Sequence, residues 1–150
     1  MKYRKSQIGW IVILVFGLTI IFINVAQVNQ GENNPFPFLV FRVFAFLFVV
    51  IGLLFYKLTV ELIGSTLKLT YGIGLIRIKF HMDEMQRSEV IKTPWYWGLG
   101  IRMTPKGMLY NIQGSKAVKI EYISKGERKS VMVGTPEPEQ LKKALDHNFK

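Results

Sequence analysis

The sequence contains no cysteine among its 150 residues and only two histidines, His81 and His147. Without cysteine, the chain can form neither a disulfide framework nor a thiolate metal site. The histidines do not have the spacing of a metal site or a catalytic triad, and the phosphate-binding glycine loop, the nucleophile elbow and the HExxH motif are missing. We therefore expect a protein that is not an enzyme, with no cofactor and no metal.

Charged residues are almost missing from two apolar runs near the N-terminus, residues 8–28 and 36–56. Each run of about 21 residues is long enough to cross a hydrocarbon core of ~30 Å. The sequence therefore predicts a transmembrane helical hairpin over residues 1–57, followed by a separate domain over 58–150. The single charge in the second run, Arg42, is expected to snorkel or to pair with Glu32, and a pore or substrate charge is the alternative.

The basic residues near the N-terminus predict the orientation of this hairpin. Lys2, Arg4 and Lys5 precede the first run, whereas the connecting residues 29–35 contain no lysine or arginine. The positive-inside rule then places both termini in the cytoplasm. A cleavable signal peptide is the competing interpretation, but the apolar stretch is too long and no suitable cleavage site follows it.

Residues after 57 alternate between apolar and polar side chains, as half-buried strands do. We expect seven antiparallel strands, at about residues 58–62, 67–71, 76–82, 98–103, 108–112, 117–123 and 130–133. A helix should close the chain, with Thr135 as its N-cap, Pro136 in its first turn and an apolar face at Leu141, Ala144, Leu145 and Phe149.

The stretch 93–102, TPWYWGLGIR, and the following 104–111, TPKGMLYN, resemble the bacterial pleckstrin-homology-like (PH-like) membrane proteins, a mostly uncharacterised group. The resemblance extends from about Leu58 to His147. It implies a membrane-anchored α+β fold: the transmembrane hairpin, then a PH-like seven-stranded antiparallel β-barrel or sandwich capped by one C-terminal helix. It also implies an integral protein of the bacterial cell membrane, and it brings no catalytic residues.

Two groups of residues are candidates for contact with a partner or with lipid. The basic positions Arg77 and Lys79 would lie on one strand face, for which a solvated surface is the alternative. The aromatic-basic segment contributes Trp95, Tyr96, Trp97, Arg102 and Lys106, for which core packing is the alternative. The net charge of +10 favours anionic surfaces, but no recognition helix or RNA-binding aromatic motif indicates nucleic acid.

The sequence thus predicts a non-enzymatic, membrane-anchored interaction or scaffold module. It would present its PH-like domain at the cytoplasmic membrane face, for a protein partner or for homo-oligomer formation. An electrostatic module that binds anionic lipid is the second hypothesis, and an oligomeric channel or transport accessory is the third. No specific small-molecule ligand is expected, and the bilayer itself is the remaining partner.

Overall fold

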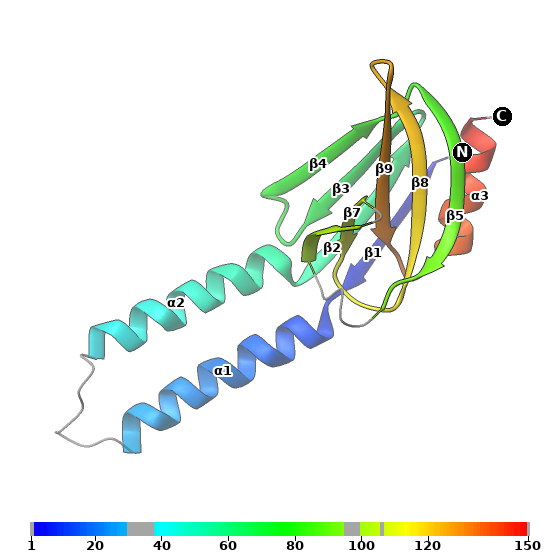
Figure 1. Ribbon diagram of the computed structural model, residues 1–150. Helices are drawn as coiled ribbons and strands as arrows, with labels where there is room; N and C mark the ends of the chain where they lie inside the picture. The colour runs from blue at the N-terminus through cyan, green and yellow to red at the C-terminus, as the bar shows by residue number, and fades with distance from the viewer. Residues whose placement is uncertain (1, 30–37, 95–99, 106, 150) are drawn as a thin grey trace.

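The computed structural model describes residues 2–29, 38–94, 100–105 and 107–149. In Figure 1 two long helices project from one end of a β-structure, and a short helix packs against its side. The elements in chain order are β1 (Tyr3–Ile8), α1 (Trp10–Asn29), α2 (Phe38–Phe55), β2 (Lys57–Ile63), β3 (Thr66–Tyr71), β4 (Ile76–His81), β5 (Glu84–Lys92), β6 (Gly100–Thr104), β7 (Gly107–Asn111), β8 (Lys116–Ser124), β9 (Glu127–Gly134) and α3 (Pro138–Asn148).

The strands form two sheets, with the orders β1-β2-β3-β4 and β5-β8-β9-β7-β6. Neighbouring strands are antiparallel except for β7 and β9, which are parallel. Strand β1 pairs with β2 from Tyr3 opposite Leu62 to Ile8 opposite Lys57. The helix pair α1–α2 is therefore an insertion between two neighbouring strands of one sheet.

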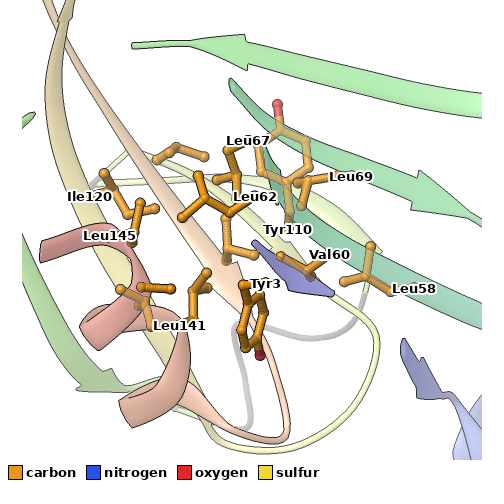
Figure 2. Close-up of a cluster of buried hydrophobic side chains, with 14 of the residues drawn as sticks. Tyr3, Leu58, Val60, Leu62, Leu67, Leu69, Tyr110, Ile120, Leu141 and Leu145 are labelled. Carbon is orange, nitrogen blue, oxygen red and sulfur yellow. The ribbon is translucent and has the colours of Figure 1, made fainter. Parts of the chain in front are cut away.

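The apolar alternation along the chain produces a core between the two sheets and α3 (Figure 2). In β2 and β3 every second residue is buried, because successive side chains of a strand point to opposite faces. The buried set of these two strands is Leu58, Val60, Leu62, Leu67, Leu69 and Tyr71. Ile120 of β8 and Leu141 and Leu145 of α3 join the same cluster.

The C-terminal helix is present but begins at Pro138, two residues later than predicted. Thr135 lies three residues before the helix, where its hydroxyl accepts a hydrogen bond from Glu137 N at 3.4 Å and lies 2.8 Å from the Tyr3 hydroxyl of β1. Glu137 occupies the N-cap position without a side-chain cap. Thr135 is therefore not the N-cap that the sequence pattern predicted, and its hydroxyl joins β1 to the segment that leads into α3.

The predicted transmembrane hairpin is not supported: in the part of the chain that the structure describes, no helix is long and apolar enough to cross a membrane. Both helices are shorter than the predicted runs, since Ile8 belongs to β1 and Tyr56 lies beyond the end of α2. Asn24 and Arg42 also shorten the stretches without charged or amide side chains to 10–23 and 43–55. The predictions of an integral membrane localisation, of membrane anchoring and of the orientation derived from them are therefore wrong.

The predicted seven-stranded antiparallel barrel or sandwich is also corrected by the structure. The described residues form nine strands in two sheets, one of which contains a parallel pair. Strands β1 and β5 were not predicted, because both are mostly polar. In β5 the register shifts between Met85 and Arg87, which breaks the period-two pattern by which a strand is recognised.

Candidate functional site

The outer face of the four-stranded sheet is strongly cationic. Residues directly opposite each other on paired strands lie on the same face, and the register aligns Arg4, Glu61, Lys68 and Lys79 in one row across the four strands. Arg77 lies in the adjacent row, opposite Thr70. Of the predicted contact residues, Arg77 and Lys79 are therefore placed together on one exposed face, as the sequence predicted.

Positive charge on this cationic face exceeds negative charge. One oxygen of the Glu61 carboxylate accepts a hydrogen bond from Arg4 Nε at 2.9 Å. The other oxygen lies 3.5 Å from Lys68 Nζ. Lys79 stands directly opposite Lys68, and like charges in that position destabilise a sheet. Arg77 Nε donates a hydrogen bond of 2.7 Å to the Gly74 carbonyl, which holds its side chain close to the turn. This face can attract an anionic surface.

The other predicted contact residues do not lie on this face. Arg102 is exposed on β6, the edge strand of the five-stranded sheet. Trp95, Tyr96, Trp97 and Lys106 lie outside the described residues. The structure therefore places Arg77 and Lys79 on one sheet and Arg102 on the other, so these three residues do not form a single patch.

The helix pair packs through one side of each helix. Phe16 of α1 meets Phe48 of α2 with ring centroids 5.4 Å apart, and a Cβ added to Gly52 would meet the Phe16 ring at 3.8 Å. Half-buried α1 residues recur at helical spacing on this side: Val12, Phe16, Ile20 and Ile23. The two helices thus cover only one stripe of each other.

The opposite side of each helix is apolar and exposed. On α1 we define the outer stripe as Leu14, Leu18, Ile21 and Val25, which follow a 4-3-4 spacing and so share one face turned away from α2. Among the exposed large apolar side chains of α1, the exposed fraction ranges from 40% at Ile13 to 85% at Val28. On α2 the exposed apolar residues include Leu39, Val43, Phe44, Phe46, Leu47 and Leu53.

The base of the helix pair is joined to the sheets by backbone hydrogen bonds. Gly9 N donates to Tyr56 O at 2.7 Å, which ties the two entry points together. Gly72 N donates to Lys57 O at 2.7 Å, and Ile73 N donates to Leu53 O at 3.3 Å. These bonds fix the direction in which the helix pair leaves the β-structure.

Neither histidine is placed in an arrangement typical of catalysis. His81 Nδ1 lies 3.0 Å from the Thr66 hydroxyl, and its Nε2 lies 4.0 Å from an Asp83 carboxylate oxygen at the exposed end of β4. Within the described ranges, no three His, Asp or Glu side chains are close enough together to hold a metal ion.

The sequence pattern gave an incomplete account of these features. It singled out Arg77 and Lys79, but Arg4 and Lys68 became part of the same face only through the pairing of β1 and β3 with β2. The 4-3-4 spacing of the outer stripe is visible in the sequence, where it lies within the apolar run that predicts a membrane span.

Comparison with known proteins gives no relative for this chain: no protein-family model, no curated protein and no solved structure matches it. The resemblance to PH-like membrane proteins therefore stays a prediction. The function has to be argued from the surfaces themselves.

Proposed function

We propose that this protein is a non-enzymatic interaction module that self-associates through the outer stripe of α1. The observation that carries the proposal is the exposure of Leu14, Leu18, Ile21 and Val25 on a face that no other described element covers. Contiguous exposed apolar surface of this extent marks an interaction site in proteins.

A second copy of the chain is the occupant that this stripe fits. The 4-3-4 spacing is that of the a and d positions of a coiled coil, where a helix packs against a matching helix. The stripe contains no charged side chain that could select a partner of opposite charge. A two-fold interface needs a surface that is complementary to itself, and an apolar stripe satisfies that condition.

The exposed apolar area is sufficient for a stable dimer. A large apolar side chain that is about half exposed leaves roughly 100 Å² in contact with water. About eight such side chains would supply the ~800 Å² per partner of a standard interface. The four residues of the outer stripe supply about half of that area, and the exposed side chains that flank them on the same side of α1, Trp10, Ile11, Phe22 and Val28, supply the rest.

The experiment is light scattering on the full chain, separated by size-exclusion chromatography over a range of concentrations. We expect a dimer, or a pair of dimers, that dissociates when Leu18→Gln and Ile21→Gln are combined. Glutamine retains good helix propensity, so the substitutions remove apolar contact and keep the helix. The matched control combines Ile63→Gln and Leu75→Gln, which are exposed apolar residues outside the helix pair, and it should dissociate like the unaltered chain.

Two results would contradict the proposal. One is a monomer at every concentration for the unaltered chain. The other is equal weakening of the assembly by the stripe variant and by the control. Association of the unaltered chain with uncharged lipid vesicles, at the expense of the dimer, would assign the stripe to lipid and would also overturn the proposal.

The cationic face supports a second function, electrostatic binding of an anionic lipid surface. Arg77 and Lys79 favour it, because both are exposed on this face, where an anionic surface would attract them. Binding to vesicles that contain anionic lipid should fall steeply with ionic strength and be weakened by Lys79→Gln, whereas the exposed Lys143→Gln on α3 serves as the matched control. Binding that is insensitive to salt and to Lys79→Gln would refute this function.

A further inference from the structure

Strand β4 (Ile76–His81) is an outer strand of the four-stranded sheet, and it is paired with β3 on one side. None of the described strands pairs with its other side, and β4 lies across the β-structure from α3 in Figure 1. The edge strand β5 differs, since α3 packs against it and Ser88 Oγ donates a hydrogen bond of 2.6 Å to Asp146. An uncovered edge is a template on which another chain can form a strand.

The pairing with β3 fixes the direction of the backbone groups of β4. Met82 N donates to Ser65 O at 3.0 Å, one step beyond the opposed pair Thr66 and His81. In an antiparallel pair, residues that exchange backbone hydrogen bonds alternate with residues that do not. The N–H and C=O groups that point away from β3 therefore belong to Arg77, Lys79 and His81. No described residue forms a backbone hydrogen bond with these groups.

The two faces of β4 differ in chemistry. On the outer face Arg77 and Lys79 are exposed, and neither forms an ion pair with a described residue. On the inner face Ile76 and Ile78 pack against the core but stay half-buried. Leu69, which lies opposite Ile78 on β3, is fully buried. The edge thus leaves apolar surface uncovered on one face and positive charge unpaired on the other.

We propose that the free edge of β4 binds an acidic strand of another protein, added antiparallel as the neighbouring strands of this sheet are. Residues directly opposite each other share a face, so the partner residues opposite Arg77 and Lys79 would be aspartate or glutamate. The partner residues between them would point to the inner face and cover Ile76 and Ile78, which requires apolar side chains. The partner is therefore a segment in which acidic and apolar residues alternate, held by main-chain hydrogen bonds.

A second copy of β4 does not fit this edge, because two antiparallel β4 strands would place basic side chains opposite basic side chains. An anionic lipid surface would satisfy the charge, but it would leave the alternating backbone groups unpaired and the inner face uncovered. The proposal goes beyond self-association, since β4 contains none of the four residues of the outer stripe. It gives Arg77 and Lys79 a partner other than lipid.

The test is fluorescence anisotropy of a short labelled peptide that alternates valine and glutamate, titrated with the full chain. We expect saturable binding of one peptide per chain, and binding weaker by about tenfold or more when lysine replaces glutamate in the peptide.

Two N-methylated peptides test the backbone contact. In the antiparallel register the glutamate N–H groups face β4, whereas the valine N–H groups face away from it. Methylation of the glutamate amides should abolish binding, and methylation of the valine amides should leave it intact.

Charge reversal on β4 tests the side-chain contact. The double variant that combines Arg77→Glu and Lys79→Glu should prefer the lysine peptide to the glutamate peptide. A glutamate at position 79 would stand opposite Lys68, so the change replaces a like-charge pair within the sheet by an attractive pair. The matched control combines Lys92→Glu and Lys143→Glu, which are exposed on β5 and α3, and it should keep the original preference. Circular dichroism and the urea midpoint establish that each variant is folded.

The proposal fails if the glutamate peptide does not bind saturably, or if methylation of its glutamate amides leaves binding unchanged. It also fails if the folded double variant of β4 still prefers the glutamate peptide. Binding of vesicles that contain anionic lipid, without binding of the peptide, would assign Arg77 and Lys79 to a lipid surface and overturn the proposal. None of these results depends on the outer stripe, so the failure of self-association would be seen separately in the light-scattering experiment.

Discussion

Replacing Gly72 with alanine should destabilise the chain more than its local conformation alone requires. Gly72 follows β3 at the base of the helix pair and has φ +53°, in the left-handed region that favours glycine. A Cβ at this position would lie 2.2 Å from the Leu53 carbonyl oxygen and 2.4 Å from the Leu54 carbonyl oxygen. Both oxygens belong to the last turn of α2, so the helix end would have to move.

The expected magnitude has two parts. An L-residue in the left-handed conformation costs about 1–2 kcal/mol, and alanine returns about 0.4–1 kcal/mol by restricting the unfolded chain. Overpacking adds about 1–3 kcal/mol when surrounding atoms must shift. We therefore expect Gly72→Ala to lower the free energy of unfolding by about 3 kcal/mol.

The control is Gly64→Ala, which has a similar φ of +57° but no atom within 4 Å of the added Cβ. Because it carries only the conformational cost, we expect a loss of about 1 kcal/mol. Equilibrium urea unfolding, with the slope compared between variants, measures both. Equal losses for the two variants would refute the close approach of α2 to the turn after β3.

Two further predictions concern tyrosines. Tyr71→Phe should raise the free energy of unfolding by about 1 kcal/mol in the same urea assay, because the buried Tyr71 hydroxyl has no hydrogen-bond partner among the described residues and phenylalanine removes it; a loss of 1 kcal/mol or more would contradict that reasoning. Burial also raises the pKa of Tyr3, Tyr110 and Tyr122, so the folded chain keeps protons that the unfolded chain releases near pH ~10. The contribution of these tyrosines to the free energy of unfolding should therefore be complete below that pH and should decline as pH rises through the folded pKa values. Urea midpoints that stay constant from pH 8 to 11 would contradict the prediction.

The strands with apolar alternation could be predicted from the sequence, and those without it could not. Leu58, Val60 and Leu62 alternate with polar residues, and the structure places them in β2 with all three buried. In β1, by contrast, Lys5 and Gln7 lie on the same face as the buried Tyr3. Lys5 pairs with Glu137 and Gln7 donates to the Gln113 carbonyl, and both contacts depend on segments more than 100 residues away.

The apolar helices show a different limit of the sequence. Their composition predicted two helices, and α1 and α2 are both present, but composition alone does not say what the apolar faces contact. The pairing of β1 with β2 makes the helix pair an insertion within a sheet, and no local pattern signals that connection.

The most direct test of self-association is disulfide crosslinking of the single variant Leu18→Cys in the full chain. Because the chain has no cysteine, a disulfide can form only between two copies. Leu18 lies near the middle of the outer stripe, so its side chains approach each other in a parallel or an antiparallel pair of helices. The account predicts rapid formation of a covalent dimer under mild oxidation. The control is Leu75→Cys, because Leu75 is 72% exposed and lies outside the helix pair, and this variant should form no covalent dimer. Equal crosslinking of the two variants, or none at Leu18→Cys, would contradict it.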